Sequence, residues 1–178
     1  LLSCNSGEIL VMFIAAVIGM PVPLFPIQIL WINLVTDGLP ALALGFDPAA
    51  PDIMKRPPRR PDEAFITRRR AIAILGQGAV IAACSLAAFA VLSAHGHTLP
   101  RARTGAFFVL ASAQLCHAFN CRSTRDSLFQ LGLRSNMKLV WAVLISFALE
   151  LMVVYIPPLQ RIFKTEGLHP RAFATVLV

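Results

Sequence analysis

Three acidic residues stand inside stretches of sequence that are otherwise apolar enough to cross a membrane: Glu8, Asp37 and Glu150. A carboxylate at the centre of a membrane helix costs about 2.5–3.5 kcal/mol on insertion scales. Partner side chains, water or a bound cation must compensate for that cost, so these positions are the first candidates for chemistry. Glu150 comes near the outer end of its apolar stretch, seven residues before Pro157. We expect it to lie near the membrane interface in a structural role.

The other two acidic residues have polar neighbours at helical spacing. Asn5 precedes Glu8 by three residues, which places the two side chains about 60° apart on a helix. Asn33, Thr36 and Asp37 follow the i, i+3, i+4 pattern and share an arc of about 100°. Only a few residues join the two apolar stretches, so we expect antiparallel neighbours whose polar faces meet. Two carboxylates, two amide oxygens and one hydroxyl would then form one cluster.

An oxygen-rich cluster of this kind suits a hard cation. Ca²⁺ takes six to eight oxygen ligands, and Cys4 is the one soft ligand expected near the cluster, which disfavours zinc and copper. Gly38 and Pro40 weaken the helix just after Asp37, and because Pro40 lacks an N–H, the carbonyl of Thr36 loses its helical partner. Broken membrane helices coordinate ions through such carbonyls. We predict cation binding; the alternative is an interhelical hydrogen-bond cluster with a packing kink.

The composition indicates that these residues belong to a membrane protein. The chain is 57% hydrophobic and 14% charged, whereas a soluble domain carries about 25% charged residues. We predict an all-α, multi-span transmembrane helix bundle, because apolar stretches near the required length of about 20 residues recur along the chain. Five spans are expected at about 1–20, 26–46, 71–94, 104–121 and 138–157, with the start of a truncated sixth near 171. Both ends resemble cuts through helices, so we expect a fragment of a longer protein.

The positive charge lies in the connections between the spans. Seven of the sixteen Lys and Arg residues lie in 55–70 and four in 122–138. By the positive-inside rule, the proline-rich basic loop 47–70 and the connection 122–138 are cytoplasmic. The net charge of +7 does not indicate nucleic-acid binding, because no basic patch is interleaved with aromatic residues as single-strand binding requires.

Several motifs resemble the membrane domain of type II P-type ATPases. "PIQILWINLVTDGLPALALGFDPAAPDIMKRPPR" resembles their sixth transmembrane helix and the following loop, and is most similar to the sarco/endoplasmic reticulum calcium pump and its bacterial relatives. "SCNSGEI" resembles the cation-binding part of the fifth helix, "AQLCHAFNCRS" the eighth helix, and "YIPPLQRIF" the end of the ninth. The resemblance covers residues 1–178 and implies the C-terminal transmembrane region, from within the fifth helix to the start of the tenth.

The resemblance also implies a set of metal ligands. The family's ion ligands fall on Asn5, Glu8, Asn33, Thr36 and Asp37. Asp37 matches the carboxylate that calcium pumps share between two sites. Gln114 stands where the two-site pump has a glutamate. An amide is a weaker, neutral ligand, so the second site is in doubt and the first is better supported.

The implied function is that of a P-type cation-transporting ATPase, for which Ca²⁺ is the expected transported ion, exported or sequestered with proton countertransport. Glu8 is the expected proton carrier, because a carboxylate emptied of its cation in an apolar site favours its protonated form. ATP and Mg²⁺ would bind domains absent from this chain, which contains neither the D-K-T-G nor the TGE sequence and is not catalytic alone. Rival cargos are Mn²⁺ and Na⁺ or K⁺.

The expected partners are the rest of the pump polypeptide and the lipid bilayer. The resemblance favours a multi-pass protein of the bacterial plasma membrane over an endomembrane protein. The alternative outside the pump class is a stand-alone, non-catalytic membrane subunit that binds or regulates a partner.

The charge distribution makes a prediction about topology. In a variant whose native cysteines are replaced by serine, Arg60→Cys should react with a membrane-impermeant thiol reagent only from the cytoplasmic side, because Arg60 lies in the basic loop. His97→Cys, in the connection 95–103, is the matched control and should react only from outside. Labelling of the Arg60→Cys variant in intact cells would show that the assignment is inverted.

Overall fold

The computed structural model describes residues 1–47, 66–122 and 132–168, and this part of the chain is helical without strands. The predicted all-α class is therefore confirmed. The elements in order are α1 (Leu2–Val17), α2 (Pro26–Trp31), η1 (Ile32–Thr36), α3 (Gly38–Leu44), α4 (Arg68–Ala94), α5 (Leu99–Asn120), η3 (Leu133–Asn136), α7 (Met137–Tyr155) and α8 (Pro157–Phe163).

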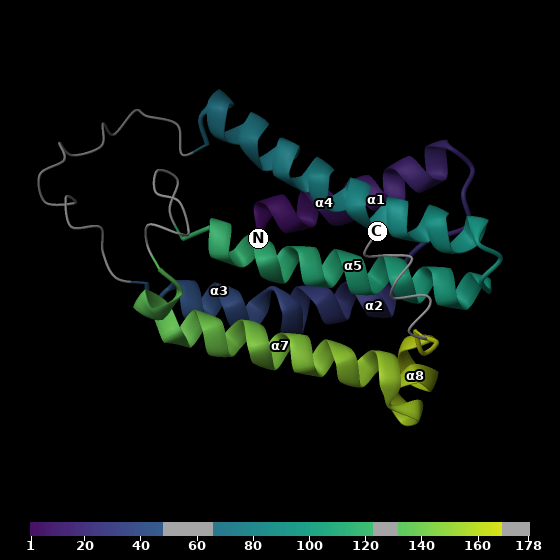
Figure 1. Ribbon diagram of the computed structural model, residues 1–178. Helices are drawn as coiled ribbons and strands as arrows, with labels where there is room; N and C mark the ends of the chain where they lie inside the picture. The colour runs from purple at the N-terminus through teal and green to yellow at the C-terminus, as the bar shows by residue number, and fades with distance from the viewer. Residues whose placement is uncertain (48–65, 123–131, 169–178) are drawn as a thin grey trace, which may run out of the picture.

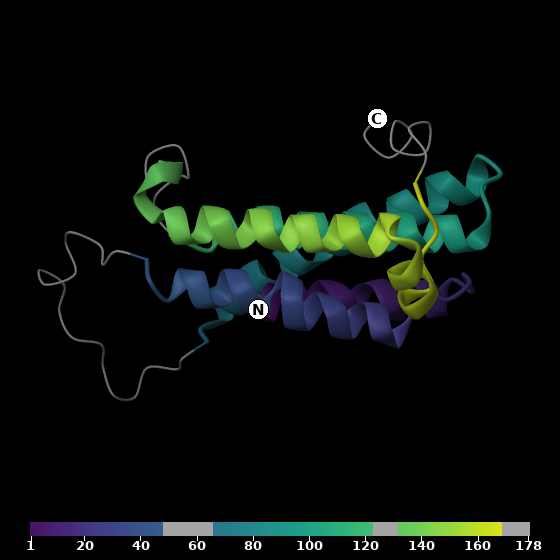
Figure 2. The same ribbon diagram turned by 90° about the horizontal axis from the view of Figure 1, so that it is seen from below.

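The long helices lie side by side in one bundle, with α4 tilted against its neighbours (Figure 1). In the view of Figure 2, α7 forms a layer above α1, α2 and α3. The main contacts run from α1 to α4, from α4 to α5, from α5 to α7, and from α7 to α3. The first two spans were expected to be close neighbours, but α1 packs mainly against α4. Two glycines that face each other, Gly7 and Gly78, allow that close approach.

Within the described residues, three helical stretches are long and apolar enough to cross a membrane: Pro26–Leu44, Arg68–Ala94 and Met137–Tyr155. Helix α1 is apolar but has only 16 residues, so it ends before residue 20, where the first span was expected to end. Helix α5 has 22 residues but is less apolar. The expected sixth span near 171 lies outside the described residues.

Helix α4 begins three residues before the expected start of the third span at 71. Its N-cap is Thr67, whose hydroxyl accepts a hydrogen bond from the backbone N–H of Arg70 at 3.4 Å. A threonine at this position satisfies one of the free N–H groups of the first turn. The last three residues of the predicted loop 47–70 therefore belong to the helix, and residues 48–65 of that loop lie outside the described part of the chain.

The second span is broken where the sequence carries its polar residues. It consists of α2, a π-helical turn η1 and α3. The N–H of Asp37 donates to the carbonyl of Ile32 at 2.9 Å, a bond that spans five residues instead of four. Single π-helical turns inside α-helices occur frequently at functional sites. Pro40 contributes to the break because it cannot donate to the carbonyl of Thr36.

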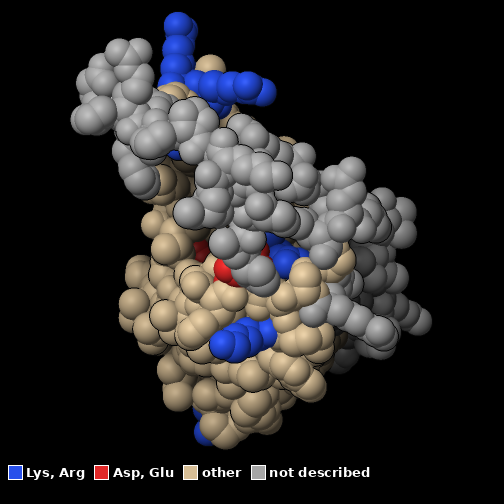
Figure 3. Space-filling model, turned by 90° about the vertical axis from the view of Figure 1, so that its left-hand side faces the viewer, with Lys and Arg blue, Asp and Glu red and all other residues tan. Residues whose placement is uncertain are grey.

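The ends of α3 and α5 and the start of α7 are joined by a partly buried ion pair. Arg122 Nη2 lies 3.0 Å from Asp47 Oδ1, and Asn136 Nδ2 donates to the same oxygen at 3.0 Å. Figure 3 looks onto this end of the molecule, where basic side chains gather. Arg68 at the start of α4 and Lys138 at the start of α7 belong to the same end. The helix ends that flank the two basic connections therefore lie together, as the positive-inside assignment requires.

The close packing of α1 against α4 predicts how a substitution at Gly78 changes the stability of the protein. A Cβ atom on Gly78 would lie 2.9 Å from the carbonyl oxygen of Ser3 and 2.9 Å from Ser6 Cβ. Gly78→Ala should therefore destabilise the protein by about 1–3 kcal/mol. Gly76→Ala is the matched control in the same helix, because a Cβ there meets nothing within 4 Å, and it should be neutral or stabilising by up to about 1 kcal/mol. Thermal unfolding of the purified protein in detergent measures both, and equal midpoints would contradict the proposed close contact.

Candidate cation site

The Glu8 carboxylate joins three separate elements of the bundle. Glu8 is buried, with 5% of its surface exposed. Its Oε2 accepts a hydrogen bond from Asn33 Nδ2 at 2.8 Å, and its Oε1 accepts one from Gln114 Nε2 at 3.1 Å. The two donors come from η1 and α5 respectively. Both carboxylate oxygens of Glu8 are therefore satisfied by amide groups, which is the compensation that a buried carboxylate requires.

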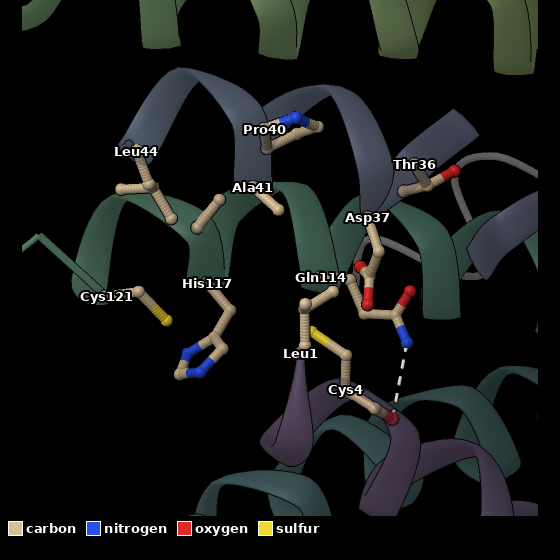
Figure 4. Close-up of a pocket in the computed structure, with 11 residues that line it drawn as sticks. Leu1, Cys4, Thr36, Asp37, Pro40, Ala41, Leu44, Gln114, His117 and Cys121 are labelled. Atoms are coloured by element: carbon tan, nitrogen blue, oxygen red, sulfur yellow. Dashed lines mark hydrogen bonds between the residues drawn. The ribbon is translucent and has the colours of Figure 1, made fainter. Parts of the chain in front are cut away.

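Three buried oxygen atoms next to Glu8 have no such compensation. Asp37 Oδ2, Thr36 Oγ1 and Gln114 Oε1 have no hydrogen-bond partner among the described residues. Asp37 and Thr36 are only 6% and 1% exposed. Figure 4 shows the side chains of Asp37 and Gln114 pointing toward one another between α3 and α5. Buried polar atoms without partners are rare in folded proteins, and many of them serve a bound water or ion.

The side chains of Asp37, Thr36 and Gln114 line a cavity of about 30 Å³, which exceeds the space that one water needs. Pro40, Ala41 and Leu44 of α3 line the same cavity further along the span that carries Thr36 and Asp37, across from α5 (Figure 4). The cavity therefore holds oxygen atoms at one end and apolar groups toward the other. A small hard cation fits such a place, because it replaces water by carboxylate and amide oxygens.

Soft ligands are more numerous here than the sequence suggested. Cys4 was expected to be alone, but His117 and Cys121 also line the cavity. Both follow Gln114 on one face of α5, at i+3 and i+7, so one helix presents all three. In the described residues, however, no group of three or more His, Cys, Asp or Glu side chains is placed to hold a metal ion. The arrangement therefore offers mainly amide, hydroxyl and carboxylate oxygens.

The predicted ligands differ in how the structure places them. Glu8, Asn33 and Gln114 are joined by hydrogen bonds, and Thr36 and Asp37 share a cavity with Gln114. The side chain of Asn5 is exposed on α1, and the structure does not bring it into this cluster. Gln114, the weakest candidate from the sequence, lies at the centre, where it touches Glu8 and also donates to the carbonyl of Cys4 at 3.4 Å.

The fold and the site together describe a membrane helix bundle with a broken span and buried oxygens that have no hydrogen-bond partner among the described residues. The sequence matches the family described as "Cation transporting ATPase, C-terminus" over residues 21–178, and the chain belongs to this family. The predicted membership of the C-terminal region of P-type ATPases is thereby confirmed.

Two curated bacterial proteins are similar to the chain over its whole length. It is 45% identical over 178 residues to "Calcium-transporting ATPase" of Bacillus subtilis (strain 168), covering 99% of this chain and 20% of the relative. It is 40% identical over 195 residues to "Calcium-transporting ATPase 1" of Bacillus cereus (strain ATCC 10987 / NRS 248), covering 100% of this chain and 22% of the relative. The chain thus spans about a fifth of these relatives. Together with the apolar helices, they show a multi-pass bacterial membrane protein.

Proposed function

We propose that this chain is the cation-binding and translocating part of an ATP-driven calcium pump that exchanges Ca²⁺ for protons. The observation that carries the proposal is the set of unpaired oxygens of Asp37, Thr36 and Gln114, three residues that line one cavity. Gln114 also connects this cavity to Glu8 through a hydrogen bond. The names of the bacterial relatives support Ca²⁺ as the cargo. ATP and Mg²⁺ bind the remaining pump polypeptide, which corresponds to most of the length of those relatives.

Asp37 is the proposed first ligand for an arriving cation. Its Oδ2 is free of hydrogen bonds within the described chain, so this carboxyl oxygen is available to a cation. Glu8 is already held by two amide donors, so a cation can reach it only after Asn33 or Gln114 turns away. Glu8 therefore serves mainly as the proton carrier. Mn²⁺ accepts the same oxygen donors and is the rival cargo, since carboxylate and carbonyl ligands suit both ions.

The proposed cluster favours one Ca²⁺ per transport cycle. Gln114 occupies the place of a possible third carboxylate, and its neutral amide contributes no charge to offset dehydration of a divalent ion. Its Nε2 is moreover engaged by Glu8, which leaves one amide oxygen available. The remaining negative charges are those of Glu8 and Asp37, which suffice for one divalent cation.

The role of Asp37 can be tested by removing its charge. Asp37→Asn in the full-length protein should abolish cation-dependent phosphorylation by ATP, because it removes one negative charge from the cluster with almost no change in shape. Phosphoenzyme formation across a range of Ca²⁺ concentrations is the measurement. Asp47→Asn is the matched control: it weakens the ion pair with Arg122, so it should lower thermal stability without shifting the Ca²⁺ dependence. Unchanged cation affinity in Asp37→Asn would show that Asp37 only holds helices together.

The stoichiometry can be tested by restoring the missing carboxylate. Binding of radioactive calcium to the purified full-length protein, normalised to phosphorylation sites, should give a ratio of about one. Gln114→Glu should raise that ratio toward about two, because it adds a third carboxylate at the centre of the cluster. A ratio near two with a cooperative isotherm in the unmodified protein would contradict the proposed role of Gln114.

A further inference from the structure

Glu150 is a second buried acidic group, separate from the Glu8 cluster. It lies within α7, and its side chain is 0% exposed. Neither carboxyl oxygen has a well-formed hydrogen bond to the described residues. The expectation that Glu150 lies near the membrane interface concerns its depth in the bilayer and stays a prediction. Within the described bundle its side chain is fully covered by protein.

The surroundings of Glu150 contain one polar partner. The hydroxyl of Ser112 on the neighbouring helix α5 lies within reach of Glu150, and, like both carboxyl oxygens of Glu150, it has no hydrogen-bond partner among the described residues. The elements packed against α7 carry other titratable or charged groups, namely Asp37 between η1 and α3, Arg101, Arg103, Cys116 and His117 on α5, and Arg161 on α8. In the described part of the chain, none of them forms a hydrogen bond with Glu150.

A carboxylate in these surroundings is neutral. An ionised carboxylate buried in apolar surroundings without a cation or several donors is very unfavourable, and such a group takes up a proton instead. The protonated form has an O–H that can donate to the Ser112 hydroxyl, which lies on the facing helix α5. The pair is therefore a place where the bundle holds a proton.

This pair lies on the other side of α5 from the cation cluster. Ser112 and Gln114 are two residues apart, which is about 200° around a helix. Gln114 bonds to Glu8 of α1, whereas Ser112 faces Glu150 of α7. One turn before Glu150, the hydroxyl of Ser146 donates to the carbonyl of Val35 at 3.1 Å. Helix α7 is thereby attached to η1, the turn that positions Asn33 and Asp37.

We propose that Glu150 and Ser112 form a second proton-binding site of the pump, in addition to Glu8. When η1 rearranges around a cation, the bond between Ser146 and Val35 moves α7 relative to α5 and admits water to Glu150. The carboxyl O–H bond then breaks and its proton leaves to that water, while Ser112 donates its hydroxyl to the carboxylate. The proton returns when the cation leaves. The transport part of this proposal rests on the proposed function, whereas proton binding by Glu150 does not.

Infrared spectroscopy of the full-length protein without Ca²⁺ tests proton binding directly. The carbonyl band of a protonated carboxylic acid should lose intensity in Glu150→Gln, a nearly isosteric change, and should shift in Ser112→Ala, which removes the hydrogen-bond partner. Glu166→Gln is the matched control, because Glu166 pairs with Arg101 at 2.6 Å outside the spans, and it should leave the band unchanged. An unchanged band in both Glu150→Gln and Ser112→Ala would overturn the proposal.

Transport in proteoliposomes tests whether the proton moves. The number of protons countertransported per Ca²⁺, followed with an internal pH-sensitive dye, should be lower in Glu150→Gln than in the unmodified pump and unchanged in Glu166→Gln. An unchanged ratio together with a lost infrared band would also overturn the proposal, because Glu150 would then be a permanently protonated structural group. Absence of Ca²⁺ uptake by the unmodified pump would instead contradict the proposed function.

Discussion

The arrangement of this membrane domain depends on the burial of one carboxylate, Glu8, among apolar helices. Its two oxygens take amide donors from η1 and α5, at 2.8 and 3.1 Å. Without these donors the charge would be uncompensated, which is strongly destabilising in a medium that lacks water. Helix α1 packs mainly on α4. The two hydrogen bonds that Glu8 needs also attach α1 to the broken span and to α5. They also engage the Asn33 and Gln114 amides, so within this cluster Asp37 Oδ2 is the carboxylate oxygen left without a hydrogen bond.

The break in the second span has a related physical origin. A continuous α-helix satisfies its own carbonyls and leaves none for a ligand. The π-helical turn Ile32–Thr36 and Pro40 change that pairing beside Asp37. The surrounding bundle must support the weakened helix, and it does so from two sides, because η1 contacts both α5 and α7. The hydroxyl of Ser146 provides one such support by bonding the carbonyl of Val35.

The sequence was sufficient to predict the fold class, the family and the segments that carry the polar residues, because buried charges and proline breaks are local features. It did not predict which face of each helix is buried. Asn5 is exposed, whereas Glu8, three residues later, is covered. That difference follows from the packing of α1 on α4 at Gly7 and Gly78. This is a long-range contact, which the spacing of residues along one helix cannot predict. The complete burial of Glu150 likewise depends on the helices packed around α7, which its position in the sequence does not reveal.

Helix α5 shows why a helix that is surrounded by protein inside such a domain can have low hydropathy. It is the fourth expected span and the least apolar of the long helices, yet many of its residues are buried, among them Gln114 and His117. A helix that faces lipid must be apolar outside, whereas a helix surrounded by protein can place polar side chains on neighbouring helices. In α5, Gln114 contacts α1 and Ser112 contacts α7. Its low hydropathy is therefore a consequence of its position between two buried acids, Glu8 and Glu150.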